Sequence, residues 1–214
     1  RRQRQMCIRD RPNAAHISIA EFKKKWRNKA DIIHITQNID TLCEEAGDAG
    51  VFHLHGSFLT SRCTECGATF PRMGLYKEGN VCPACKACGW SVRTDVVLFG
   101  EQPHGLDWIP GVLRRAEAFL AVGTSGMVYP AAGFVTEARR RNCRTRILIA
   151  KDAPLDGFQP LSTDNDSVGH FTKFVRGNAT TVLPAVLETL GNWIERVTEK
   201  TETEQPQTTL DNDE

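Results

Sequence analysis

Residues 31–56, DIIHITQNIDTLCEEAGDAGVFHLHG, contain two short apolar segments that each end in polar residues. The first, residues 32–35, is short and β-branched, as buried strands often are, and it runs into the polar sequence TQN. The second, residues 51–54, leads into His55 and Gly56. Ligands of open α/β sheets bind beyond the carboxyl ends of strands. The stretch therefore predicts two strand ends that direct polar groups toward one crevice.

Further along the chain, predicted strands alternate with predicted helices. The apolar run Ala118–Val122 is a strand by this criterion, residues 131–141 a helix and residues 147–150 the next strand. Helical spacing of apolar residues also predicts a helix that opens at Pro12 and a final helix around residues 183–197. Repeated βα units imply a parallel sheet, so the predicted fold class is α/β with a Rossmann-like sheet.

Five of the eight cysteines crowd into one short stretch. The pattern Cys-x-x-Cys-Gly occurs first with Cys63 and Cys66 and again with Cys85 and Cys88, and such turns bring two thiolates to one ion. A rival pair, Cys82 and Cys85, lacks the trailing glycine and would leave Cys88 unused. Because four thiolates fill a tetrahedral site, we predict one structural zinc ion. Its predicted ligands are Cys63, Cys66, Cys85 and Cys88.

Composition limits the alternatives. With 214 residues, of which 40% are hydrophobic and 25% charged, the chain can bury one core and carry a small additional module. A formal net charge of +1 gives no argument for a nucleic acid or an anionic membrane as partner. No apolar run approaches the roughly 20 residues of a membrane span, and no signal peptide is recognisable. Cysteines at metal-ligand spacing favour a reducing compartment, so we expect a cytoplasmic protein.

The blocks TQNID and HLHG, at their separation in this chain, resemble the sirtuins, which are NAD-dependent protein lysine deacylases. The paired CxxC, VVLFGE at residues 96–101 and GTSGMVYPAA at residues 123–132 also match that family. The resemblance extends from about Pro12 to Leu190 and is closest to the bacterial and mitochondrial branch that removes acidic acyl groups such as succinyl. It implies transfer of an acyl group from a protein lysine to ADP-ribose, with NAD as co-substrate and release of nicotinamide.

The resemblance also implies roles for individual residues. His55, in the HG block, would be the general base that takes a proton from a ribose hydroxyl, and His53 would be structural. NAD would be bound by Gln37, Asn38, Asp40, Gly123, Thr124, Ser125 and Ala179. The acyl-lysine peptide would be bound by Val96, Phe99, Gly100 and Glu101, through main-chain strand addition. Arg1 falls where the branch keeps the arginine that binds an acyl carboxylate, although a solvated basic end is the alternative that the sequence alone favours.

Two features depart from the family pattern. Sirtuins carry an N-terminal glycine-rich loop of the type GAGxS for the NAD pyrophosphate, and residues 1–11 contain nothing like it. We therefore expect the chain as given to lack part of the NAD site. After the strand at residues 147–150 the family has an asparagine that binds a ribose, whereas this chain continues with Lys151.

These observations predict the domain organisation. Residues 12–60 and 94–197 would form the Rossmann-like domain, and residues 61–93 the zinc-binding module. Residues 1–11 are interpreted as an end of doubtful origin, and residues 198–214, which have no apolar stripe, as a disordered polar tail.

Two other functions fit parts of the sequence. The first is a zinc-ribbon binding module for nucleic acid, which would need clustered basic and aromatic residues around the cysteines. Residues 61–92 offer only four basic residues, Arg62, Arg72, Lys77 and Lys86. The second is an inactive or truncated sirtuin-like fragment that acts only through interactions.

Overall fold

The computed structural model describes residues 11–48, 50–72, 74, 80–86, 91–124, 131–152 and 170–203, with side chains up to residue 200. Arg1, Cys88 and Ser125, which carry predicted roles, lie outside the described residues, as do residues 204–214 of the predicted tail. Within the described part of the chain, no helix is both long and apolar enough to cross a membrane.

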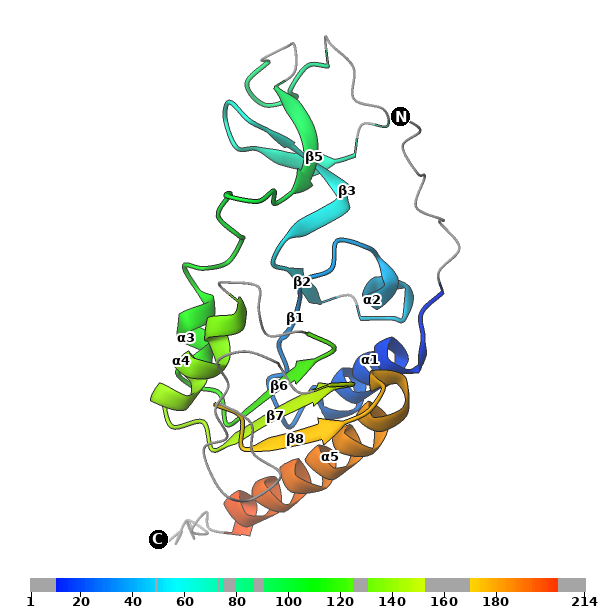
Figure 1. The fold of residues 1–214 in the computed structure, drawn as a ribbon, viewed down its shortest axis with the longest axis vertical. Coiled ribbons are helices and arrows are strands. Elements are labelled where there is room, and N and C mark those ends of the chain that lie inside the picture. Colours follow the sequence, from blue (N-terminus) through cyan, green and yellow to red (C-terminus); the bar gives the residue numbers. More distant parts are fainter. Residues whose placement is uncertain are drawn as a thin grey trace, which may run out of the picture.

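The described chain alternates helices and strands in the order shown in Figure 1. The helices are α1 (Ala14–Trp26), α2 (Leu42–Glu45), α3 (Ile109–Leu113), the 3-10 turn η1 (Ala131–Gly133), α4 (Phe134–Arg140) and α5 (Ala179–Thr203). The strands are β1 (His34–Thr36), β2 (Val51–His53), β3 (Gly56–Cys63), β4 (Thr69–Pro71), β5 (Val92–Val96), β6 (Ala118–Val122), β7 (Thr145–Ala150) and β8 (Lys173–Arg176).

Two parallel sheets form the body of the molecule. One pairs β1 with β2, and the other has the order β6-β7-β8. Successive residues of β7 face opposite sides, as strand geometry requires. Ile149 packs with residues of α1 and α5, and Leu148 packs with Val135 of α4. Helices therefore cover both faces of this sheet (Figure 1), and the predicted α/β class with a parallel sheet is confirmed.

Helices α1 and α5 pack against each other beneath the sheet. Asn13 caps α1, since its side chain accepts the N–H of Ala15 at 3.0 Å while His16 Nδ1 accepts the N–H of Asn13 at 3.2 Å. At the crossing, Trp26 is 4% exposed and lies on Gly191, where a Cβ would come within 2.8 Å of the indole ring. The contact between the two helices therefore depends on a residue without a side chain.

A third sheet carries the cysteines. It is antiparallel, has the order β4-β3-β5 and stands apart from the parallel sheets (Figure 1). The β3–β5 ladder runs from Gly56 opposite Val96 at one end to Cys63 opposite Val92 at the other. Its buried apolar cluster contains two cysteine side chains, Val92 and the half-buried Phe70, so little apolar surface supports it.

Several element boundaries differ from those predicted. The strand predicted at residues 147–150 begins earlier, at Thr145, and β5 ends at Val96 because residues 98–101 form a turn. The helix predicted at residues 131–141 is divided into the 3-10 turn η1 and helix α4, which ends at Arg140. Helix α5 continues to Thr203, past the predicted start of a disordered tail at residue 198. Extending a helix that is already packed costs little, so its last turns need no apolar stripe.

Candidate active site and cysteine cluster

The strands β1 and β2 end at the same edge. They run parallel with Thr36 opposite His53, and the chain continues from them into Gln37 and His55 respectively. Leu54, which is fully buried, donates its N–H to the Thr36 carbonyl at 2.9 Å and so fixes the turn that carries His55. The predicted convergence of two polar strand ends is present.

The imidazole of His55 is held by the backbone of the neighbouring strand end. Its Nδ1 lies 3.0 Å from the carbonyl oxygen of Gln37, and the side chain is half-buried. A carbonyl oxygen can only accept, so Nδ1 carries the ring proton and Nε2 keeps its lone pair. The His55 carbonyl in turn accepts the N–H of Val97 at 3.0 Å. This arrangement leaves Nε2 free to take a proton from a substrate group.

The position directly after His55 has no room for a side chain, which explains the glycine at residue 56. Its φ is +78°, in the region that glycine tolerates best, and a Cβ would lie 1.9 Å from the carbonyl oxygen of Asp95. Gly56 pairs with Val96 at this point, so the close approach joins the turn that carries His55 to β5. The glycine of the HG block therefore has a packing reason of its own.

The second parallel sheet contributes residues to the same region. Gly123, directly after β6, has a φ of +64° and donates its N–H to the carbonyl of Ile149 at 2.9 Å. Apart from its chain neighbours, no described residue lies within 4 Å of where its Cβ would be, so this face is open within the described part of the chain. Thr124 Oγ1 is 3.5 Å from Gln37 Nε2, a long contact that brings the two sheet edges together. Ser125 lies outside the described residues.

The turn before α5 joins this edge as well. Gly177 donates its N–H to the carbonyl of Ala150 at 3.0 Å, which attaches the turn to the end of β7. Asn178 begins the helix, since its carbonyl accepts the N–H groups of Thr181 and Val182. Ala179 is the first residue of α5 and is half-buried.

The loop after β1 is fixed by a histidine that is not the predicted base. His53 Nδ1 lies 2.8 Å from the carbonyl oxygen of Asn38, and its Nε2 lies 2.8 Å from Glu44 Oε1. Both ring nitrogens are thus engaged within the protein, as a structural role for His53 requires. Asp40 Oδ1 accepts the N–H of Leu42 at 3.1 Å, so its carboxylate helps start α2, and Asn38 remains exposed.

Residues 98–101 form a turn directly after β5. The N–H of Glu101 donates to the carbonyl of Leu98 at 2.9 Å, and Gly100 has a φ of +89°. A positive φ at the third position of a four-residue turn is the requirement that glycine meets in type II turns. Phe99 occupies the second position and is fully exposed, as is more than half of Leu98. Val96 lies at the end of β5, opposite Gly56.

Glu101 does not extend into the open side of this turn. Its carboxylate accepts the N–H of Leu98 at 3.0 Å, and it pairs with Arg62 at 3.2 Å and with Arg93. The hydrogen bond from Arg93, with that from the Leu98 backbone, lowers the pKa of Glu101 to about 2. The Glu101 carboxylate is therefore occupied by groups of the protein itself.

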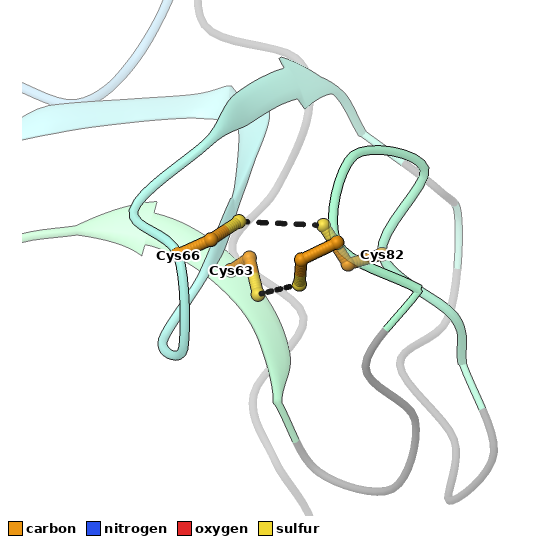
Figure 2. A group of neighbouring side chains, drawn as sticks. Cys63, Cys66 and Cys82 are labelled. Atoms are coloured by element: carbon orange, nitrogen blue, oxygen red, sulfur yellow. Dashed lines mark hydrogen bonds between the residues drawn. The ribbon is translucent and has the colours of Figure 1, made fainter.

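Four cysteine side chains meet at the far end of the β3–β5 ladder (Figure 2). The sulfur atoms of Cys63, Cys66, Cys82 and Cys85 all lie within 4.8 Å of one another. Cys63 Sγ is 3.7 Å from Cys85 Sγ, and Cys66 Sγ is 3.8 Å from Cys82 Sγ. A disulfide would need about 2 Å. Two thiolates that bind zinc at about 2.3 Å with tetrahedral angles are about 3.8 Å apart, so this set fits one zinc ion.

The second cysteine pair differs from the prediction. Among the described residues it is Cys82 that completes the set with Cys85, whereas Cys88 lies outside them. The N–H groups of Cys85 and Ala84 donate to the Cys82 sulfur and lower the pKa of its thiol to about 7, which favours the thiolate that a metal binds. We therefore replace Cys88 by Cys82 in the proposed ligand set.

Sequence reasoning missed the charged residues that surround these sites. Arg93 holds Glu101 and also donates to the carbonyl of Val96 at 2.8 Å. On the other side of the molecule the buried carboxylate of Asp48 bonds Lys23 and, at 2.7 Å, His34. No sequence motif marks either network. The only signal in the sequence for these networks was that a charged residue lies next to a predicted strand or cysteine turn.

Residues 1–130 match the Sir2 family. An NAD-dependent protein deacylase of Caulobacter vibrioides is 40% identical over 188 residues, which cover 87% of this chain and 71% of that protein. A protein of the same description from Shigella flexneri is 36% identical over 179 residues, 84% of this chain and 60% of the relative. The chain thus spans between about three fifths and seven tenths of these relatives.

Solved structures agree with the sequence relatives. A Sir2 homologue in complex with NAD is 29% identical with a TM-score of 0.65, and the match covers 86% of this chain and 66% of that one. A mutant Sir2 homologue in complex with ADP ribose is 31% identical with a TM-score of 0.66, and covers 86% and 69% of the respective chains. With a matched family over more than half its length, the chain belongs to the Sir2 family.

Proposed function

We propose that the protein is an NAD-dependent protein lysine deacylase. The observation that carries the proposal is the orientation of His55, whose Nδ1 is held by the Gln37 carbonyl at the edge where both parallel sheets end. The proposed products are free lysine, nicotinamide and an O-acyl-ADP-ribose. Proteins or peptides with an acylated lysine are the proposed partners.

His55 acts as the general base in this proposal. Its Nε2 takes a proton from a ribose hydroxyl, and its Nδ1–H stays bonded to the Gln37 carbonyl, 3.0 Å away. The imidazolium that forms is stabilised by this carbonyl without any movement of the ring. The fixed ring therefore removes the proton with no reorganisation of its own.

NAD supplies the ribosyl group that receives the acyl group, and nicotinamide leaves. Gln37, Asn38 and Asp40 are proposed to bind its nicotinamide side, and Gly123, Thr124 and Ser125 a ribose, with Ala179 near the adenine. The open face of Gly123 and the contact between Gln37 and Thr124 support this assignment.

The acyl-lysine peptide is proposed to add a strand beside residues 96–101. The exposed side chain of Phe99 and the glycine turn at Gly100 support this position. The acyl group itself is proposed to be acetyl or an acidic group such as succinyl, with Arg1 as the partner of the acidic carboxylate. Reduced thiols at a metal site fit a reducing compartment, so we propose a cytoplasmic location.

The test is a reaction of the protein, expressed from its full coding sequence, with acetyl-, succinyl- and malonyl-lysine peptides and NAD. Mass spectrometry should detect free lysine peptide, nicotinamide and acyl-ADP-ribose in equal amounts, and omission of NAD should stop the reaction. Deacylation that proceeds without NAD, or no turnover of any of the three peptides, would contradict the proposed function.

A further inference from the structure

Two arginines face each other across the ladder that joins the cysteine cluster to the catalytic turn. Arg62 on β3 is the direct partner of Arg93 on β5 in the antiparallel register. Like charges directly opposite each other destabilise a sheet. The side chains of the two arginines are 22% and 25% exposed, so water alone screens them incompletely. This pair therefore needs an anion beside it.

Glu101 provides that anion. One carboxylate oxygen binds Arg93, and the other binds Arg62 at 3.2 Å. The only other acid in ion-pair contact with these arginines among the described residues is Asp95, 3.4 Å from Arg62 Nε. Asp95 also bonds His104 at 3.2 Å, so its charge is shared. Among the described residues, Glu101 is therefore the only acid in ion-pair contact with Arg93.

The Glu101 carboxylate also stabilises the Leu98–Glu101 turn. Its second oxygen accepts the N–H of Leu98, while the backbone of Glu101 donates to the carbonyl of Leu98. The first and last residues of the turn are thus joined twice. As a result the backbone of Phe99 and Gly100 is held outward, with the Phe99 ring fully exposed.

This turn is also connected to both ends of the ladder. Toward the catalytic side, Val97 donates to the His55 carbonyl at 3.0 Å, and Val96 pairs with Gly56. Toward the metal side, Arg62 directly precedes Cys63, which pairs with Val92. A single carboxylate therefore lies where the peptide-binding turn, the catalytic turn and the cysteine sheet meet.

We propose that Glu101 is a positioning residue rather than a substrate contact: with Arg62 and Arg93 it holds the Leu98–Glu101 turn in the shape that pairs with the acyl-lysine peptide. This inference rests on the proposed deacylase function. It predicts that loss of the carboxylate weakens peptide binding and leaves proton removal by His55 intact. Its effect should thus appear in KM for the peptide, with kcat nearly unchanged.

The test compares Glu101→Ala with Glu101→Gln in the full coding sequence. The alanine variant removes every contact of the side chain, whereas glutamine keeps one oxygen for Leu98 but loses the charge. The matched control is Glu137→Ala, because Glu137 pairs with Arg141 at 3.1 Å on α4, away from the turn. Melting temperature and zinc content are measured for all variants, and if Glu101→Ala does not fold, Glu101→Gln carries the test.

Two readouts separate this inference from the proposed function. NMR hydrogen exchange of the Leu98 amide should accelerate in Glu101→Ala and not in Glu137→Ala, whether or not the protein turns over peptide. Kinetics should show a roughly tenfold higher peptide KM for Glu101→Ala, a smaller rise for Glu101→Gln and no rise for the control.

An unchanged KM in an active, folded Glu101→Ala protein overturns the positioning role and leaves the proposed function standing. A loss of kcat with unchanged KM also overturns it, since the carboxylate would then act in the chemical step. Accelerated exchange at Leu98 in a protein whose wild type deacylates no peptide would instead support the structural part of the inference and contradict the proposed function.

Discussion

His55 Nδ1 lies 3.0 Å from the carbonyl oxygen of Gln37, so the end of one strand fixes the tautomer of a histidine carried by the next. The two residues are 18 positions apart in the chain and are brought together because β1 and β2 are parallel and in register. The acceptor is the backbone carbonyl of residue 37, so this contact does not require a particular side chain at that position. The orientation of the base therefore depends on the sheet, and changes that disturb the ends of β1 or β2 should affect it first.

Gly56→Ala tests the close approach between the catalytic turn and β5. The new Cβ would meet the Asp95 carbonyl at 1.9 Å, and φ at this position is +78°, so both a clash and backbone strain oppose the substitution. We expect the free energy of unfolding to fall by about 3 kcal/mol, as measured by urea denaturation. Gly47→Ala is the control, because φ there is +98° but nothing lies within 4 Å of the added atom. Equal losses of unfolding free energy in the two variants would show that the clash with the Asp95 carbonyl does not contribute.

Metal analysis of single cysteine variants tests the revised ligand set. Cys82→Ser should lower the zinc content strongly and destabilise the cysteine sheet, whose small apolar cluster includes the Cys82 side chain. Cys88→Ser should keep about one zinc ion per chain. Measurement is by atomic emission after exhaustive dialysis. Retention of zinc by Cys82→Ser together with its loss from Cys88→Ser would restore the original assignment.

Asp48→Asn tests the buried charge network beneath β1. The Asp48 side chain is 2% exposed and bonds Lys23, His34 and the N–H of Gly50. Loss of the negative charge leaves the Lys23 ammonium without its partner, so we expect stability to fall by about 3 kcal/mol. Glu137→Gln, which breaks a surface ion pair, should cost less than about 1 kcal/mol.

The same network has a pH dependence with a defined direction. Burial by itself would raise the pKa of the Asp48 carboxyl, but hydrogen bonds from Lys23 and His34 outweigh it and hold the pKa below its ordinary value of 3.8. Because the folded pKa is lowered, the stabilisation is complete above 3.8 and is lost as the pH falls below that value. Urea denaturation at several pH values should therefore show wild type and Asp48→Asn converging in acid. A difference that stays constant down to pH 3 would contradict this explanation.

Much of this architecture could be predicted from the sequence. The strand Ala118–Val122 was predicted with the bounds it has in the structure, because an apolar run between turn residues has few other interpretations. The two polar strand ends of residues 31–56 were predicted from apolar runs of the same kind, whereas the role of His55 as the base came from the resemblance and stays a proposal. These features depend on residues that are neighbours in the chain.

Features that depend on register or distant pairing could not be predicted. The glycine after a CxxC turn favoured Cys88, yet the turn that reaches Cys63 and Cys66 includes Cys82. Which two of Cys82, Cys85 and Cys88 reach Cys63 and Cys66 depends on the path of the chain between the two pairs. Local turn chemistry does not determine that path. Likewise, the arginine pair of β3 and β5 becomes visible only when the ladder register is known, and the role of Glu101 follows from that register.

Replacement of His55 by alanine tests the central claim most directly. In the protein expressed from its full coding sequence, His55→Ala should keep its melting temperature and its affinity for NAD and acyl-lysine peptide, because within the described residues the imidazole makes one hydrogen bond, to a backbone carbonyl. Deacylation followed by mass spectrometry should fall by about 10²- to 10⁴-fold, the usual cost of losing a general base. A folded His55→Ala protein that deacylates the peptide at the wild-type rate would contradict the assignment of His55 and the mechanism built on it.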